Sequence, residues 1–128
     1  AIKLDPRFAG AYVNRGNAER ERLDLTDAIA DYSRAIELSP TAALAFYNRA
    51  WAHYLGGEND QALSDADRAL EIDPHSASAF STRGLIRERL ADAAGAIADF
   101  RKALEIDPAF RQPAEGLQRL KARPPASR

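Results

Sequence analysis

Residues 27–40 read DAIADYSRAIELSP, and this stretch recurs twice further along the chain. The copy DQALSDADRALEIDP ends at Pro74, and the copy AGAIADFRKALEIDP ends at Pro108. A shorter fragment, AIKLDP, ends at Pro6, so the prolines at 6, 40, 74 and 108 stand at a constant step of 34 residues. A fixed period of this length indicates stacked structural repeats, each burying its apolar side against its neighbours.

Each copy carries small and apolar residues at i, i+4, i+7 and i+8, which places them on one face of an amphipathic helix. They are Ala28, Tyr32, Ala35 and Ile36, then Ala62, Ala66, Ala69 and Leu70, then Ala96, Phe100, Ala103 and Leu104. Each copy ends in Ser-Pro or Asp-Pro, and proline disfavours helical geometry in the residue before it. The sequence therefore predicts a helix that stops just before each proline.

Another helix is expected in front of each copy and one more after Pro108, over residues 8–22, 46–55, 80–90 and 111–121. In the first of these we expect Tyr12, Gly16 and Leu23 on the inward side. Thr26 and Asp27 are expected to cap the helix that follows. Glycines at 56 and 57 predict a turn, because glycine readily takes the left-handed conformation that ends a helix. Residues 91–92 are expected to turn without a glycine.

At these positions the chain resembles the tetratricopeptide repeat, a helix-turn-helix unit of 34 residues. Its aromatic, small, alanine and second aromatic slots correspond to Tyr12, Phe46 and Phe80, to Gly16, Ala50 and Gly84, to Ala28, Ala62 and Ala96, and to Tyr32, Ala66 and Phe100. The resemblance implies an all-α, right-handed solenoid of antiparallel helix pairs. The expected repeats span 9–42, 43–76 and 77–110, with a capping helix at 111–122, the end of a preceding repeat at 1–8 and a disordered tail at 123–128. Ala66, in an aromatic slot, suggests that the second repeat packs differently around Trp51 or Phe46.

The leucine slot of the family holds arginine in every copy, at Arg15, Arg49 and Arg83. An aspartate follows each arginine sixteen residues later, at Asp31, Asp65 and Asp99. A charge that recurs together with its counter-charge is usually structural, so we predict Arg–Asp pairs within the repeats. The alternative is a row of arginines that binds phosphate or an acidic peptide.

Composition excludes several classes of function. A net charge of -1 and a pI near 6.2 offer no electrostatic argument for nucleic acid or an anionic membrane. Cysteine is absent, and no apolar run approaches the length that spans a bilayer, so we expect a soluble chain, with the cytoplasm as the favoured location. The lack of methionine suggests a piece of a longer protein. Fifteen arginines against three lysines suggest a bacterial genome.

In this family the first helices of the repeats line a groove that receives a peptide, and the resemblance implies the same here. The residues expected on that face include asparagines, which can both donate to and accept from a peptide backbone, and aromatic residues typical of binding hot spots. The candidate peptide-binding residues are Asn14, Asn17, Arg20, Tyr47, Asn48, Trp51, Tyr54, Thr82, Leu85 and Arg89. The alternative for Trp51 and for Tyr54 is that they fill the space between repeats.

One subtype of the family, in heat-shock co-chaperones, grips a C-terminal carboxylate with asparagines, lysines and an arginine. Asn17 and Asn48 stand where its asparagines would, but its basic positions hold Val13, Ser78 and Thr82. A carboxylate buried there would lack a counter-charge, so the sequence argues against this ligand.

No catalytic constellation is found. His53 and His75 lie twenty-two residues apart with no cysteine nearby, which is not a metal-ligand spacing, and no cofactor is expected. The sequence therefore predicts a non-catalytic scaffold that binds a protein or peptide. Two alternatives stay open: a recognition or regulatory arm of a larger enzyme such as a glycosyltransferase, and a homodimer formed through Ile2, Leu4 and Phe8.

Overall fold

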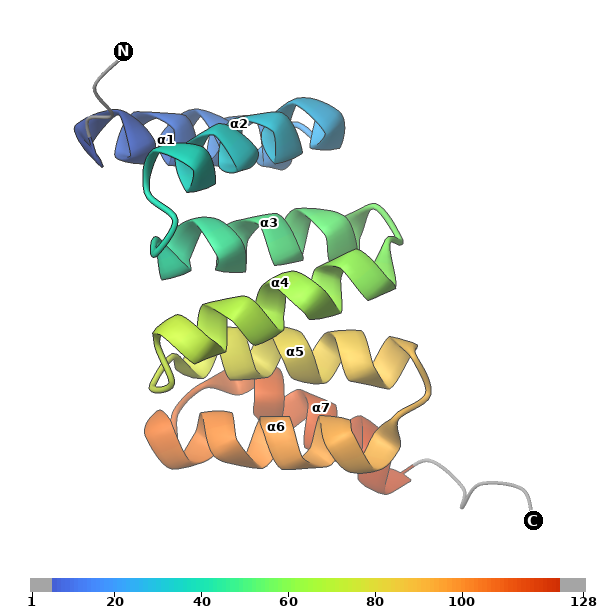
Figure 1. Cartoon of the computed structure of the whole chain (residues 1–128). Helices are drawn as coiled ribbons and strands as arrows, with labels where there is room; N and C mark the ends of the chain where they lie inside the picture. Colours follow the sequence, from blue (N-terminus) through green and yellow to red (C-terminus); the bar gives the residue numbers. More distant parts are fainter. Residues whose placement is uncertain (1–5, 123–128) are drawn as a thin grey trace. The chain divides into compact units, whose positions relative to one another are not determined.

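A computed structural model describes residues 6–122, and this range contains seven α-helices (Figure 1). They are α1 (Pro6–Glu21), α2 (Leu25–Leu38), α3 (Ala43–Leu55), α4 (Asn59–Ile72), α5 (Ala77–Arg89), α6 (Ala93–Ile106) and α7 (Arg111–Ala122). Three antiparallel pairs followed by a single helix confirm the all-α repeat fold with a capping helix. The chain divides into two compact units, Ala1–Pro74 and His75–Arg128.

The first unit holds two helix pairs. Helix α1 packs along α2, α2 packs on α3, and α3 packs along α4, while α1 also touches α3. The buried cluster between the first three helices consists largely of small residues around one aromatic side chain: Ala9, Val13, Ala28, Tyr32, Ala35, Ala45 and Ala52. Because these side chains are small, the helix backbones can approach one another closely.

The second unit holds one helix pair and the capping helix. Helix α5 packs along α6, α6 packs on α7, and α5 also touches α7. Its buried apolar residues include Ile86, Ala96, Phe100 and Ala103. Pro113 lies in the first turn of α7, where the ring requires no broken hydrogen bond, and it is buried.

Glycine at the small position of the first helix leaves room for an aromatic ring of the second helix. A Cβ atom added to Gly16 would stand 2.7 Å from Cε1 of Tyr32, and one added to Gly84 would stand 2.5 Å from Cε1 of Phe100. In the second repeat both slots hold alanine, Ala50 and Ala66, and both residues are buried. The volumes are therefore complementary, with glycine facing an aromatic ring and alanine filling both slots where the ring is missing.

The turn inside each repeat uses one residue in the left-handed region. These residues are Leu23 (φ 63°), Gly57 (φ 78°) and Ala91 (φ 66°), and they stand at the same position of the 34-residue period. The expectation that Leu23 faces inward is wrong, because in this turn its side chain is 68% exposed.

Helix starts differ from repeat to repeat. Capping of α2 by Thr26 and Asp27 is wrong: the helix begins at Leu25, and the N-cap residue Asp24 makes no side-chain cap hydrogen bond. Asp27 lies in the first turn instead, where a carboxylate interacts favourably with the helix dipole. Helices α5 and α6 do have side-chain caps, since Ser76 accepts from the amide of Ala79 and Asp92 accepts from the amide of Gly95.

Of the residues expected to form a dimer, Ile2 and Leu4 lie outside the described residues, and Phe8 is 60% exposed. None of the helices between residues 6 and 122 has the length and apolar character needed to cross a membrane.

Candidate functional site

The predicted Arg–Asp pairs are confirmed in all three repeats. The Nε atoms of Arg15, Arg49 and Arg83 donate to Asp31, Asp65 and Asp99 at 2.7, 2.7 and 3.0 Å. In each pair an Nη2 atom donates to the second carboxylate oxygen at 2.8 Å, so every contact is bidentate. The aspartates are buried, so each arginine supplies the counter-charge of a buried carboxylate.

A third residue approaches each of these aspartates from one turn further along the first helix. In the third repeat it is Arg87, whose Nη1 donates to Asp99 at 2.9 Å. In the second it is His53, whose Nε2 lies 3.7 Å from Asp65 while Nδ1 lies 2.8 Å from Glu58 at the end of the turn. In the first repeat this position holds Glu19, a carboxyl group facing another carboxyl group.

The pKa values of the two carboxyl groups of the first repeat are shifted in opposite directions. A hydrogen bond with Asp31 raises the pKa of Glu19, and burial and the charge of Asp31 raise it further. Hydrogen bonds from Arg15 hold the pKa of Asp31 well below its usual range, against the effect of burial. Oε1 of Glu19 is buried and makes no hydrogen bond. The first repeat therefore carries an unfavourable carboxyl pair that the other two lack.

The first-slot aromatic residue of each repeat lies beneath the paired arginine. The guanidinium carbons of Arg15, Arg49 and Arg83 lie 5.5, 5.7 and 5.6 Å from the ring centroids of Tyr12, Phe46 and Phe80, respectively. These distances are within cation–π range. The signal was present in the sequence, as an aromatic residue three positions before each arginine, but it was not predicted.

In the first unit, the candidate face combines polar and aromatic side chains from α1 and α3. Arg20 donates from Nη1 to Oδ1 of Asn48 at 3.0 Å, which links the two helices, and Asn48 is only 4% exposed. The ring of Trp51 stacks on that of Tyr54 with centroids 5.3 Å apart and planes 21° apart. Tyr47 lies on the same helix stripe at i-4 from Trp51, and all three aromatic residues are half-buried.

The asparagines of this face have different surroundings. Asn14 is exposed, whereas Oδ1 of Asn17 accepts a hydrogen bond from the hydroxyl of Tyr32 at 2.5 Å. Oδ1 of Asn48 is likewise occupied by Arg20. Among the three, Asn14 alone is fully on the surface, and the other two hold neighbouring side chains in place.

In the second unit, the candidate residues on α5 divide by burial. Thr82 is 2% exposed and Leu85 is also buried, whereas Arg89 is exposed. Between α5 and α7, Ser81 donates to Oε1 of Gln112 at 2.7 Å, and Arg119 forms two hydrogen bonds with Glu88. Polar contacts thus hold the capping helix against α5.

Within the part of the chain that the structure describes, no three histidine, aspartate or glutamate side chains lie together as a metal site would require.

The sequence matches known repeat families over most of its length. Residues 43–76 and 77–110 each match the tetratricopeptide repeat, and residues 16–57 match a further TPR repeat family. This chain belongs to the tetratricopeptide repeat family. It shows the seven-helix arrangement of that family's domains, and no curated protein matches its sequence.

Solved structures of tetratricopeptide repeat domains are similar to it throughout. The TPR domain of Arabidopsis OM64 is 30% identical, with a TM-score of 0.88 over 91% of this chain and 96% of that one. The Sgt2 TPR domain of Aspergillus fumigatus is 29% identical, with a TM-score of 0.85 over 94% and 87%. The second TPR domain of human RPAP3, solved with the HSP70 peptide SGPTIEEVD, is 28% identical, with a TM-score of 0.87 over 93% and 100%. These organisms give no support to a bacterial source.

Proposed function

We propose that this chain is a non-catalytic interaction module that binds a peptide or a partner helix on the exposed part of the α1–α3 face. The observation that carries the proposal is the set of half-buried aromatic residues beside the Arg20–Asn48 hydrogen bond. Aromatic side chains that are already ordered by packing offer contact area at little entropic cost, as at binding hot spots. The peptide complex of the similar human RPAP3 domain supports a ligand of this kind.

Within this proposal the candidate residues take two roles. Asn14, Arg20, Tyr47, Trp51 and Tyr54 have surface that a ligand can contact, and Arg89 offers the same on the second unit. Asn17 and Asn48 hold neighbouring side chains of this face, whereas Thr82 and Leu85 are buried within the second unit.

The similar domain that binds an HSP70 peptide raises a second candidate ligand, a chaperone C-terminus. The side chains argue against it, since Val13 and Thr82 are apolar or neutral and buried, and Ser78 carries no charge. Titration calorimetry with the peptide SGPTIEEVD is expected to give no saturable heat. Micromolar binding would show that the neutral positions do not prevent carboxylate recognition.

Selection of displayed random peptides on the chain tests the main proposal. Peptides enriched on the wild-type chain are expected to lose about tenfold in affinity for the double variant Asn14→Ala, Tyr47→Ala, because Asn14 is exposed and Tyr47 is half-buried on the face. The matched control is Gln61→Ala, Ser64→Ala, two exposed positions on α4, which should bind as the wild type does. Equal binding to both variants, or no enrichment on the wild-type chain, would refute the proposal.

A further inference from the structure

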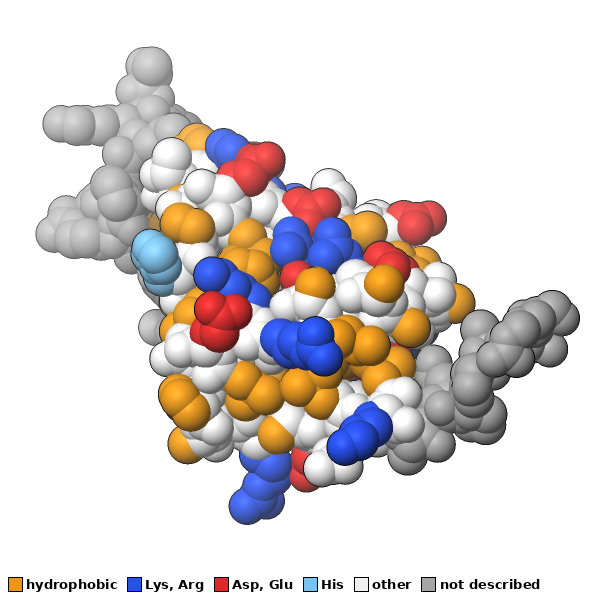
Figure 2. Space-filling model, turned by 90° about the horizontal axis from the view of Figure 1, so that it is seen from below, with side chains coloured by type: hydrophobic (Ala, Val, Ile, Leu, Met, Phe, Trp, Pro, Cys, Tyr) orange, Lys and Arg blue, Asp and Glu red, His pale blue; other side chains and the backbone are white. Residues whose placement is uncertain are grey.

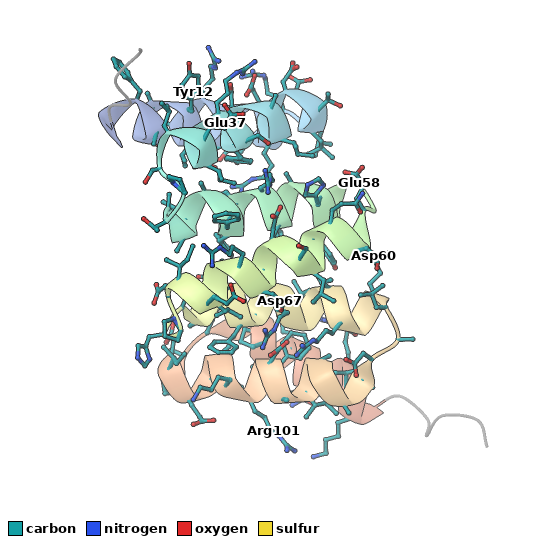
Figure 3. All side chains as sticks on the ribbon, viewed as in Figure 1. Tyr12, Glu37, Glu58, Asp60, Asp67 and Arg101 are labelled. Carbon is teal, nitrogen blue, oxygen red and sulfur yellow. The ribbon has the colours of Figure 1, made fainter. Side chains whose placement is uncertain are left out.

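An open pocket of about 490 Å³ lies between α6 and α7. Its lining combines three apolar residues, Ile97, Leu117 and Leu120, with two cations, Arg101 and Lys121. Figure 2 views the molecule from the side of these two helices and shows apolar surface with arginine and lysine side chains beside it. Arg101 projects from the outer side of α6 (Figure 3). The pocket shares no residue with the face proposed above.

In the first unit, a helix packs on the side of α3 that corresponds to the α7 side of this pocket. Two periods of 34 residues earlier, the lining positions hold Ile29, Ser33, Arg49, Ala52 and His53 on α2 and α3. Helix α4 packs on α3 there, and both Arg49 and His53 contact its Asp65, at 2.7 and 3.7 Å. Among residues 6–122, no helix packs on the corresponding side of α7, so this side of the pocket is open.

The positive charge of the pocket indicates that its occupant carries carboxylates. Lys121 stands at the position of His53 and Arg87, and each of those residues faces a buried aspartate of the helix packed upon it. Neither Lys121 nor Arg101 has an ion-pair partner among residues 6–122. A helix docked here would bind most favourably if it carried carboxylates that face these two cations.

The size of Gln118 restricts which side chain a docked helix can place against it. Gln118 occupies the small slot that Gly16, Ala50 and Gly84 hold in the three repeats, and it is exposed. Aromatic rings lie against the two glycines, whereas the repeat with alanine in this slot has alanine, Ala66, at the position of the rings. With glutamine in the slot, the docked helix needs a small side chain at the same point.

We propose that the α6–α7 pocket binds an acidic amphipathic helix of a separate protein, with a small residue at the centre of its apolar stripe and an aspartate facing Lys121. The segment RPPASR, residues 123–128, does not match such a helix, because it is cationic and contains two prolines. A second copy does not fit either, since its corresponding stripes are already buried, with Ala28, Ala62 and Ala96 at 0% exposure.

The test uses a fluorescein-labelled peptide with the sequence of residues 59–74, NDQALSDADRALEIDP, whose Asp65 and Ala66 meet both requirements. Fluorescence anisotropy should show saturable binding to the intact chain, weakened about tenfold by Lys121→Glu. A peptide with Asp65→Lys should bind the wild-type chain poorly and should regain affinity for the Lys121→Glu variant of the chain. A peptide with Ala66→Phe should lose binding, because Gln118 fills the space that a ring needs.

Control variants separate this pocket from the other face. Asn14→Ala, Tyr47→Ala should bind the peptide as the wild type does, and circular dichroism should show that Lys121→Glu remains folded. No saturable binding, or binding that Lys121→Glu does not change, overturns the proposal. A self-association of the chain that Lys121→Glu abolishes also overturns it, because the occupant would then be a second copy.

Discussion

At the scale of single residues, each repeat buries one aspartate and surrounds it with donors. Asp99 receives Arg83 and Arg87, and Asp65 receives Arg49 with His53 nearby. The first repeat departs from this arrangement, because Glu19 brings a second carboxyl group to Asp31. The hydrogen bond with Asp31 is the main cause of the raised pKa of Glu19, and desolvation and the like charge of Asp31 raise it further.

Substitution Glu19→Gln is therefore expected to raise the thermal unfolding midpoint at pH 7. Because the pKa of Glu19 is raised by folding, its stabilising contribution is present below the unfolded pKa and is lost as the pH rises through the folded one. The amide can donate to Asp31 at every pH, so the advantage of the variant should disappear near pH 4. Melting curves by circular dichroism at both pH values measure this difference.

Glu21→Gln is the matched control, since it removes the same charge from an exposed position on the same helix. The pKa of Asp31 is low in the folded state, so acid destabilises every protein that contains this pair. The Glu21→Gln control keeps both Asp31 and Glu19 and therefore shares this effect with the wild type. A variant Glu19→Gln that melts below the wild type at pH 7 would mean that the carboxylate is stabilising.

At the scale of helices, packing depends on the pairing of glycine with aromatic rings. Phe100 of α6 lies against Gly84 of α5 and Gly116 of α7, where an added Cβ atom would stand 2.5 Å from the ring in each case. One ring thereby sets the spacing of all three helices in the second unit. The sequence analysis identified Gly84 but not Gly116, because Gly116 is not at the small slot of the period.

Gly84→Ala and Gly116→Ala are each expected to lower the free energy of unfolding by about 1–3 kcal/mol, the usual effect of overpacking a core. Gly10→Ala is the control, because nothing lies within 4 Å of its Cβ position and alanine is the better helix former. Urea denaturation of the three variants measures the differences. If Gly84→Ala were as stable as Gly10→Ala, the ring of Phe100 would have room to move.

At the scale of the whole molecule, stability is expected to be distributed over the repeats. Each repeat has its own buried Arg–Asp pair, and in repeat proteins each unit is stabilised mainly by itself and its neighbours. Loss of one pair should therefore act locally.

Asp99→Asn removes the charge that Arg83 and Arg87 share, and it is expected to reduce local stability by about 2 kcal/mol. Amide hydrogen exchange should accelerate in α5 and α6 and remain unchanged in α1 and α2. Glu105→Ala, an exposed carboxylate on the same helix, serves as the control. Uniform acceleration over all helices would show that the repeats unfold as one cooperative body.

Much of this architecture was predictable from the chain alone, for a local reason. The 34-residue period, the prolines and the helical spacing of small residues predict the helix pairs, because these features act through backbone geometry within a few residues. The Arg–Asp pairs were predictable as well, since a constant separation of sixteen residues in every repeat must join the same two helix positions.

Only the tertiary structure decided how deep each side chain lies and what it contacts. Asn48 and Thr82 share a helix face with exposed residues, yet both are buried, because periodicity assigns a direction and neighbouring helices determine the depth. The contact of Phe100 with Gly116 and the pocket between α6 and α7 likewise depend on how two neighbouring helices pack on each other. Residue spacing within one helix carries no information about such contacts, since they depend on the volumes of side chains from several helices at once.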